Sequence, residues 1–341
     1  MPQDDHIIKP ARYATLCAWI VLIMGAGLAL LASNPTFIFT LKNFLGQKPS
    51  TERTIRGNFW SPPDATSIPD TEEGKLILYG RELISHTAVY LGPKGKIKTT
   101  SNGMNCQNCH LKAGTLPFGN NYSAVASTYP KFRPRSGTVE SIERRVNDCV
   151  ERSLNGKALP NDSKEMRAIV SYIKWVGKDV PKKIIPREAG ITTPSFLNRP
   201  ADSAKGKIVY QNQCSRCHGQ SGKGLMNENG VEWKYPPLHG ENSFNIGAGL
   251  FRLTRFAGYV KANMPNDQAT YEKPVLSDEE AWDVGAYVLS LPRPSKDISK
   301  DWPDISKKPV DHPFGPYADS LSEMQHKYGP FASIQTVQKR K

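Results

Sequence analysis

The stretch CQNCH at residues 106–110 decides the fold, and CSRCH at residues 214–218 repeats its pattern. Two cysteines three positions apart, followed directly by a histidine, are typical of covalent c-type haem attachment. The two thiols add to the vinyl groups of the porphyrin, and the adjacent imidazole can then reach the iron as its proximal ligand. The residues predicted to bind the cofactor are Cys106, Cys109, His110, Cys214, Cys217 and His218.

Other uses of paired cysteines agree less well with this pattern. A zinc site needs four ligands that converge, whereas the two cysteine pairs lie far apart along the chain. A CxxC redox pair would not require a histidine after both motifs. The sequence therefore predicts two covalently bound c-type haems, each with one iron.

Length and composition are compatible with two small domains that are rich in loops. The chain has 341 residues, of which 27 are glycine and 27 are proline, and 38% are hydrophobic. This length allows two separate cores. The formal net charge of +13 favours anionic partners. Because no basic run is interleaved with aromatic residues, we expect small anions rather than nucleic acid.

The N-terminal residues 1–42 contain a candidate membrane anchor. No charged side chain occurs in residues 13–41, and residues 13–32 are almost continuously apolar. That run is long enough to cross a bilayer, whereas a secretory signal has an apolar core of about 7–15 residues. We predict an uncleaved anchor that tethers a periplasmic protein to the inner membrane. The alternative is a removed signal and a soluble protein, and in both cases the remainder is exported.

Helical patterns flank each motif and predict a mostly α fold with two c-type cytochrome domains in tandem. Apolar residues at helical spacing predict helices at residues 71–85 and 161–177 around the first motif. Around the second motif we expect a helix at residues 204–213 and another that begins with a capping box at Ser277. The predicted organisation is an N-terminal membrane anchor or signal segment (1–42), a catalytic cytochrome c domain (43–180), a linker (181–200), an electron-transfer cytochrome c domain (201–295) and a C-terminal extension (296–341).

Two further features complete the predicted architecture. Gly80 and Gly206 fall at comparable places in the first helix of each domain, where the absence of a side chain would let two helices cross closely. The two halves are therefore interpreted as an internal duplication of one fold. The C-terminal extension is expected to lie over the domains and to end in a disordered segment at residues 338–341.

The second axial ligand of each iron separates electron transfer from chemistry. In the second domain Met264 is the leading candidate, because it precedes the last helix and its thioether suits electron transfer. Met226 and His239 are alternatives, and Met264 could instead fill the core. The first domain offers no comparable methionine, since Met166 lies on the apolar face of a predicted helix. Cys149 stands in the matching region.

Cys149 is a lone cysteine in the arginine-rich stretch RRVNDCVERS at residues 144–153. Cationic neighbours lower the pKa of a thiol and favour the thiolate, which is both the nucleophile and the metal ligand. On the residues alone, an inert buried cysteine on an otherwise solvated basic face is an equally acceptable interpretation. Since four cysteines attach haem and Cys17 lies in the apolar N-terminal segment, no structural disulfide is expected.

Three stretches of the chain resemble the dihaem thiosulfate dehydrogenases, which also act as tetrathionate reductases. They are residues 133–160, 236–249 and 261–265, and the resemblance as a whole covers about residues 70–335. Any c-type cytochrome has a CxxCH motif. Two such motifs together with Cys149 inside the first stretch are far more specific.

The resemblance implies a set of site residues. The implied iron ligands are His110 and Cys149 at the active-site haem, and His218 and Met264 at the electron-transfer haem. The implied catalytic and substrate-binding residues are Cys149, Arg135, Arg145, Ser153 and, more weakly, Lys157. Some family members have a lysine directly before the methionine, and it can compete for the iron. Asn263 occupies that position in this chain, so we do not expect such an exchange of ligands at the second haem, although Lys261 remains a distant competitor.

The resemblance also implies an enzyme that interconverts two thiosulfate ions and tetrathionate by making or breaking an S–S bond. Cys149 as thiolate would act as in thiol–disulfide exchange, and arginines would neutralise the anions. The haems would pass two electrons singly to or from a cytochrome or another small carrier. The alternatives are a non-catalytic dihaem electron carrier and a different sulfur-oxidising cytochrome that acts with a carrier protein. A dihaem peroxidase is less expected, because it normally has an open or histidine-ligated site where Cys149 lies.

Overall fold

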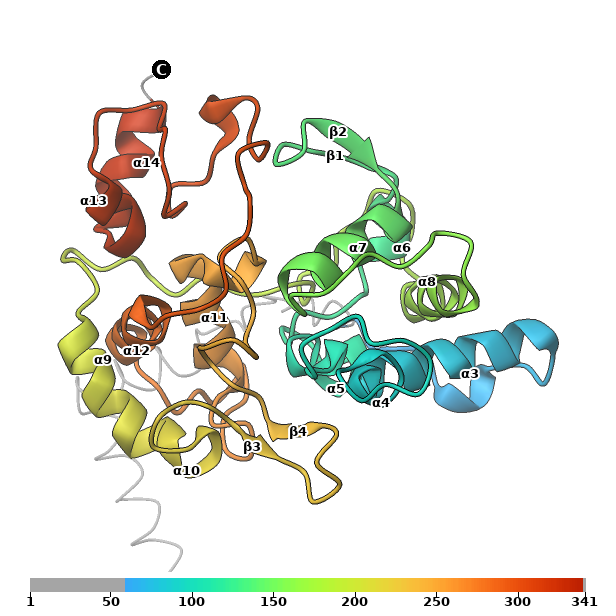
Figure 1. Ribbon diagram of the computed structural model, residues 1–341. Coiled ribbons are helices and arrows are strands. Elements are labelled where there is room, and N and C mark those ends of the chain that lie inside the picture. The colour runs from blue at the N-terminus through green and yellow to red at the C-terminus, as the bar shows by residue number, and fades with distance from the viewer. Residues whose placement is uncertain (1–58, 340–341) are drawn as a thin grey trace, which may run out of the picture. The chain divides into compact units, whose positions relative to one another are not determined.

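The computed structural model describes residues 59–339, and residues from Phe59 onward belong to one compact unit (Figure 1). The predicted anchor at residues 1–42 lies outside the described residues. Within residues 59–339, no helix combines the length and the apolar character needed to cross a membrane.

Helices surround both CxxCH stretches, and the strands of the described residues form short two-stranded hairpins (Figure 1). Before residue 181 the elements are η1 (Ala65–Ser67), α3 (Glu72–Ser85), α4 (Thr87–Leu91), η2 (Cys106–Asn108), α5 (Leu111–Gly114), α6 (Val125–Thr128), β1 (Lys131–Arg133), β2 (Thr138–Glu140), α7 (Ile142–Arg152) and α8 (Lys164–Val176). The second half contains α9 (Ser203–Val209), η3 (Tyr210–Cys214), α10 (Ser215–His218), β3 (Leu225–Met226), β4 (Trp233–Tyr235), η4 (Gly249–Phe251), α11 (Leu253–Asn263) and α12 (Asp278–Ser290). After it come η5 (Ile305–Lys307), α13 (Glu323–Tyr328) and α14 (Phe331–Lys339). The expected mostly α class is confirmed.

The helices predicted on either side of the two motifs are confirmed. The side chains of Thr71 and Ser163 cap α3 and α8 by accepting hydrogen bonds from backbone N–H groups of the first turn. Ser277 and Glu280 form the predicted capping box at the start of α12. Helix α9 continues into a π-helical turn over Tyr210–Cys214, which carries the chain directly into the second motif.

One close helix crossing occurs in each half. In the first half Gly80 of α3 lies against α8, where a Cβ atom would overlap the backbone carbonyl of Ala168. In the second half Gly206 of α9 lies against α12 in the same manner, at the carbonyl of Asp283. The absence of a side chain therefore sets the distance between the paired helices. This repeated crossing supports the predicted internal duplication.

Each half has its own hydrophobic core. The first core is built on α3 and α8 and includes Met166, whose side chain is fully buried, as predicted. The second core is built on α9, α11 and α12 and is centred on Trp282. Both cores contact the partly buried Cys106, so the first haem motif lies where they approach each other.

The C-terminal extension is more ordered than its composition suggests. Phe331 and Ile334 of α14 are buried in the second core, and the Phe331 ring centroid lies 5.4 Å from that of Trp282. Helix α14 runs through Lys339, so the prediction of a disordered end is wrong for residues 338–339. The physical reason is that two apolar side chains, spaced by almost one helical turn, find a hydrophobic surface on the second domain. Residues 340–341 lie outside the described part.

Candidate haem centres and active site

A cavity of about 630 Å³ collects the predicted ligands of the second haem. Cys214, Cys217, His218 and Met264 all line it. The remaining walls are largely apolar and include Phe244, Leu250, Phe256, Val260, Val284 and Val288. Two thiols, an imidazole and a thioether around an apolar space are the donor set and the surroundings that a c-type haem requires. The residues present therefore fit the cofactor.

The imidazole of His218 is oriented for metal binding. Its Nδ1 lies 2.8 Å from the carbonyl oxygen of Pro236, which can only accept a hydrogen bond. Nδ1 must therefore carry the proton and donate it, which leaves Nε2 free to act as a ligand. Burial lowers the pKa of His218 and so favours the neutral, ligating form.

Met264 lies in this cavity, and the two alternative residues do not line it. Met264 follows α11 directly and precedes Pro265, which also lines the cavity. Met226 belongs to β3 and pairs with Trp233 in the hairpin. The His239 Nε2 atom lies 2.5 Å from the carbonyl oxygen of Ser221. This placement supports Met264 over Met226 and His239.

The first motif is partly buried. Burial raises the pKa of Cys106 to about 11 and that of Cys109 to about 12. The Nδ1 atom of His110 lies 2.5 Å from the carbonyl oxygen of Asn120, and its ring stacks on Tyr122 with centroids 4.6 Å apart. These contacts orient the His110 imidazole as Pro236 orients its counterpart in the second domain.

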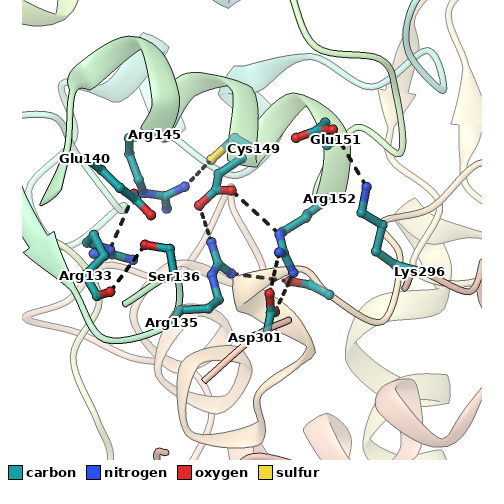
Figure 2. Close-up of polar contacts among 12 residues, drawn as sticks. Arg133, Arg135, Ser136, Glu140, Arg145, Cys149, Glu151, Arg152, Lys296 and Asp301 are labelled. Atoms are coloured by element: carbon teal, nitrogen blue, oxygen red, sulfur yellow. Dashed lines mark hydrogen bonds and ion pairs between the residues drawn. The ribbon is translucent and has the colours of Figure 1, made fainter. Parts of the chain in front are cut away.

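Helix α7 places the lone cysteine opposite this histidine. The helix begins after Ser141, whose side chain caps it, and Cys149 lies two turns further on. His110 lies within hydrogen-bonding reach of the Cys149 sulfur. The Arg145 guanidinium, one turn earlier, donates a hydrogen bond of 3.0 Å to the same sulfur (Figure 2). An imidazole and a thiol this close together could both serve as ligands of one haem iron.

The charges around Cys149 favour its thiolate. Burial alone would raise the pKa of the thiol, but the positive charge of Arg145 and the hydrogen bond with His110 outweigh that effect and lower it to about 6. The negative charge of Asp148 opposes the shift only in part. In return, the thiolate raises the pKa of Arg145, so its guanidinium stays charged. Near neutral pH the pair is therefore an ion pair.

A second group of charges fixes the C-terminal end of α7. The Arg135 guanidinium donates a 2.6 Å hydrogen bond to Asp148 and a 3.4 Å hydrogen bond to the carbonyl oxygen of Gly247. Arg152 donates two hydrogen bonds, of 2.7 and 2.8 Å, to Asp301 in the C-terminal extension. Helix α7 is thus attached to the second domain and to the extension. Paired donors of this kind hold both position and orientation.

The structure brings together some of the predicted site residues and separates others. Arg145 touches Cys149, whereas Arg135 reaches it only through the neighbouring Asp148. Ser153 ends α7, and its backbone N–H donates to the Cys149 carbonyl oxygen at 2.8 Å. Lys157 is exposed on the loop beyond the helix.

Three further residues of this region were missed from the sequence. Asp148 and Arg152 lie one and three positions from Cys149, and spacing on a helix could have linked them to it. Arg133 on β1 has a side chain only 28% exposed, and lies 3.9 Å from Glu140 across the hairpin (Figure 2).

The two haem motifs lie next to each other. The cavity of the second haem is lined by Asn108, Cys109 and Leu111 of the first domain as well as by its own residues. Tyr259 of α11 donates a 2.8 Å hydrogen bond to the carbonyl oxygen of Asn108. The second haem therefore adjoins the polypeptide that binds the first, which is favourable for electron exchange.

Comparison with known proteins agrees with this architecture. Residues 96–181 match the SoxA/TsdA cytochrome c domain, and residues 201–288 match the family of cytochrome C oxidase, cbb3-type, subunit III. The class is thus a tandem c-type cytochrome with covalently bound haems. The chain is 37% identical to a thiosulfate dehydrogenase of Psychrobacter arcticus, over 71% of each chain. It belongs to the thiosulfate dehydrogenase family.

Two other relatives extend the comparison. A thiosulfate dehydrogenase of Allochromatium vinosum is 36% identical over 68% of this chain and 83% of its own. A solved structure of the thiosulfate dehydrogenase TsdBA from Marichromatium purpuratum superimposes with a TM-score of 0.62 at 28% identity. The match covers 68% of this chain and 49% of the solved chain, so the chain matches about half the length of that relative.

Proposed function

We propose that this protein is an oxidoreductase that joins two thiosulfate anions into tetrathionate and, in reverse, cleaves tetrathionate. The names of the relatives support thiosulfate as the substrate. The observation that carries the proposal is the partly buried Cys149, whose sulfur contacts Arg145 and lies within reach of His110. A protein that only relays electrons has no need for a stabilised thiolate in that position.

The proposed iron ligands follow from the two sites. His110 and Cys149 would bind the iron of the catalytic domain (43–180), and His218 and Met264 that of the electron-transfer domain (201–295). When bound, the two haems supply one-electron redox centres that together accommodate the two electrons of the reaction. The neighbouring motifs support passage of these electrons between the domains.

Cys149 would carry the sulfur chemistry. In the oxidative direction, its thiolate and the outer sulfur of one thiosulfate form an S–S bond with release of two electrons, which leaves Cys–S–S–SO3⁻. A second thiosulfate then attacks the sulfur next to the sulfonate, forms tetrathionate, and releases the Cys149 thiolate. This second step is a thiol–disulfide exchange, and its leaving group is better when the pKa of the thiol is low. The pKa of about 6 at Cys149 supports that role.

Arg145 and Arg135 would have different roles, one in direct contact with the thiolate and one through Asp148. Arg145 holds the thiolate and partly neutralises the repulsion between it and an approaching dianion. Arg135 is hydrogen-bonded to Asp148, so its role would be to hold α7 in place and to add to the positive charge around the site. Ser153, which ends the same helix, would contact the substrate. The exposed Lys157 would only attract anions. The formal net charge of +13 has the same effect at longer range.

We also propose a location and a partner. Covalent attachment of c-type haem takes place outside the cytoplasm, and residues 1–42 would tether the protein to the inner membrane on the periplasmic side. A cytochrome or another small electron carrier would exchange electrons with the second haem.

Product analysis tests the proposal. The haem-loaded protein is mixed with thiosulfate and ferricyanide, and tetrathionate is quantified by ion chromatography; tetrathionate with reduced viologen tests the reverse direction. We expect one tetrathionate for every two thiosulfates and two ferricyanides consumed. A haem-loaded protein that is inert in both directions would be an electron carrier. Turnover that depends on an added carrier protein would instead indicate a different sulfur-oxidising cytochrome.

A further inference from the structure

Arg293 is a buried cation without a charged partner. It follows α12, and its Nη2 atom donates hydrogen bonds to the carbonyl oxygens of Val288 at 2.9 Å and Leu238 at 3.4 Å. Its Nε and Nη1 atoms are buried and have no hydrogen-bond partner in the described structure. Burial lowers the pKa of Arg293 to about 10, and no acidic group among the described residues offsets this effect.

A buried guanidinium with open hydrogen-bond donors destabilises the protein unless a further group pairs with it. An unpaired buried charge destabilises a protein by several kcal/mol, and buried donors are normally hydrogen-bonded. The other buried arginines described above all have carboxylate or thiolate partners. The guanidinium carbon of Arg293 lies 4.4 Å from the ring centroid of Phe244 and 4.9 Å from that of Phe251. These cation–π contacts hold the guanidinium in place but do not satisfy its N–H donors.

The position of Arg293 indicates what the missing partner is. Three of its neighbours, Leu238, Phe244 and Val288, line the cavity that fits the second haem. Arg293 therefore lies directly behind the cavity wall. A c-type haem is attached through its vinyl groups and keeps two carboxylates, the propionates, which need partners where they are buried. A guanidinium is the preferred partner of a buried carboxylate.

We propose that Arg293 binds a propionate of the second haem and thereby keeps this haem easier to reduce. The pairing satisfies the open donors and holds the carboxylate in its ionised form. The positive charge also disfavours the ferric state, which carries one more positive charge than the ferrous state. Arg293 is thus a positioning and potential-setting residue that makes no contact with the sulfur substrate. The inference rests on the haem cavity alone and does not depend on which anion the protein oxidises.

The reduction potential of the second haem tests this pairing. Spectroelectrochemical titrations between pH 5 and pH 9 compare the haem-loaded wild type with Arg293→Gln and Arg293→Lys, and with Lys205→Gln, which removes an exposed charge from the same domain. We expect Arg293→Gln to lower the potential of one haem and to make it pH-dependent, because an unpaired buried propionate has a raised pKa. Arg293→Lys should restore most of both properties, and Lys205→Gln should match the wild type.

An Arg293→Gln variant that is fully haem-loaded, with the potential and pH profile of the wild type, would overturn the proposal. If that variant does not fold or load haem, a crystal structure of the wild-type holoprotein decides the question. A guanidinium nitrogen within hydrogen-bonding distance of a propionate oxygen supports the pairing. A guanidinium turned to other partners refutes it.

Discussion

The guanidinium of Arg145 donates a 3.0 Å hydrogen bond to the sulfur of Cys149. The two residues lie four positions apart on α7, so one helical turn brings their side chains together. Because burial alone would raise the pKa of this thiol, the thiolate depends on its positive neighbours. The helix that presents the sulfur therefore also supplies the charge that stabilises it.

Replacement of Arg145 tests this relationship. A hydrogen bond to a charged group contributes about 1.5–3 kcal/mol, so Arg145→Gln should lower kcat/KM for thiosulfate about ten- to hundredfold. Arg145→Lys keeps the charge but loses the planar donors, so its kcat/KM should lie between those of the wild type and Arg145→Gln. Steady-state kinetics at neutral pH measure the effect. Equal kcat/KM values for wild type and Arg145→Gln would show that the contact plays no part in turnover.

The Arg135–Asp148 pair predicts a loss of stability. The two side chains are 14% and 5% exposed, and removal of one partner from such a pair costs roughly 3 kcal/mol. Arg135→Gln should therefore lower the free energy of unfolding by about that amount, measured by denaturant titration of the haem-loaded protein. Arg144→Gln is the control, because Arg144 is an exposed arginine on α7 itself. A loss no greater than that of the control would mean that Arg135 does not anchor α7.

The close crossing of α3 and α8 at Gly80 predicts that an added methyl group there lowers the stability of the first domain. In Gly80→Ala the new Cβ would overlap the Ala168 carbonyl, and overpacking of this kind costs about 1–3 kcal/mol. Gly249→Ala provides the comparison, since a Cβ at Gly249 meets no atom within 4 Å. Thermal unfolding of both variants measures the difference. If the two variants melt at the same temperature, α3 and α8 do not need the glycine to cross.

His312 in the C-terminal extension predicts a loss of stability in acid. Burial, opposed in part by the hydrogen bond with the Phe314 backbone, lowers the pKa of His312 to about 4, whereas a histidine in the unfolded chain has a pKa of about 6.5. The stabilising contribution of the neutral ring is therefore complete above pH ~6.5 and is lost as the pH falls toward 4, by up to about 3 kcal/mol.

Unfolding measured at pH 7.5 and at pH 5 detects this slope. The His312→Gln variant has no titrating ring at this position, so its stability should change less between the two pH values. A variant with the full wild-type slope would assign the acid sensitivity to other groups.

The sequence predicted the parts of the fold that depend on local signals. CxxCH stretches, helix caps such as Ser277 and the glycines at 80 and 206 are all visible within a few residues. Helix α7 was not predicted, although Ile142, Val146 and Val150 follow helical spacing, because arginine, glutamate, asparagine and aspartate fill most of its positions. The hairpins are too short to show strand periodicity.

The long-range contacts of the site could not be predicted from local sequence patterns. Arg135 meets the carbonyl of Gly247, and Arg152 meets Asp301, partners more than 90 positions away in the sequence. The same holds for α14, whose Phe331 and Ile334 pack in the core of another domain. Cys149 was singled out from its position in the chain and its arginine neighbours, which left an inert thiol equally acceptable, and the resemblance to known enzymes then implied its catalytic role.

The central claim is that the sulfur of Cys149 makes and breaks the S–S bond. The most direct measurement is thiosulfate-dependent tetrathionate formation by a Cys149→Ala variant that has been shown to carry both haems. We predict that the variant folds, retains both covalently attached haems, and forms tetrathionate at less than about one tenth of the wild-type rate, since nucleophile and thiolate are both lost. A fully haem-loaded variant with a rate near that of the wild type would contradict the account.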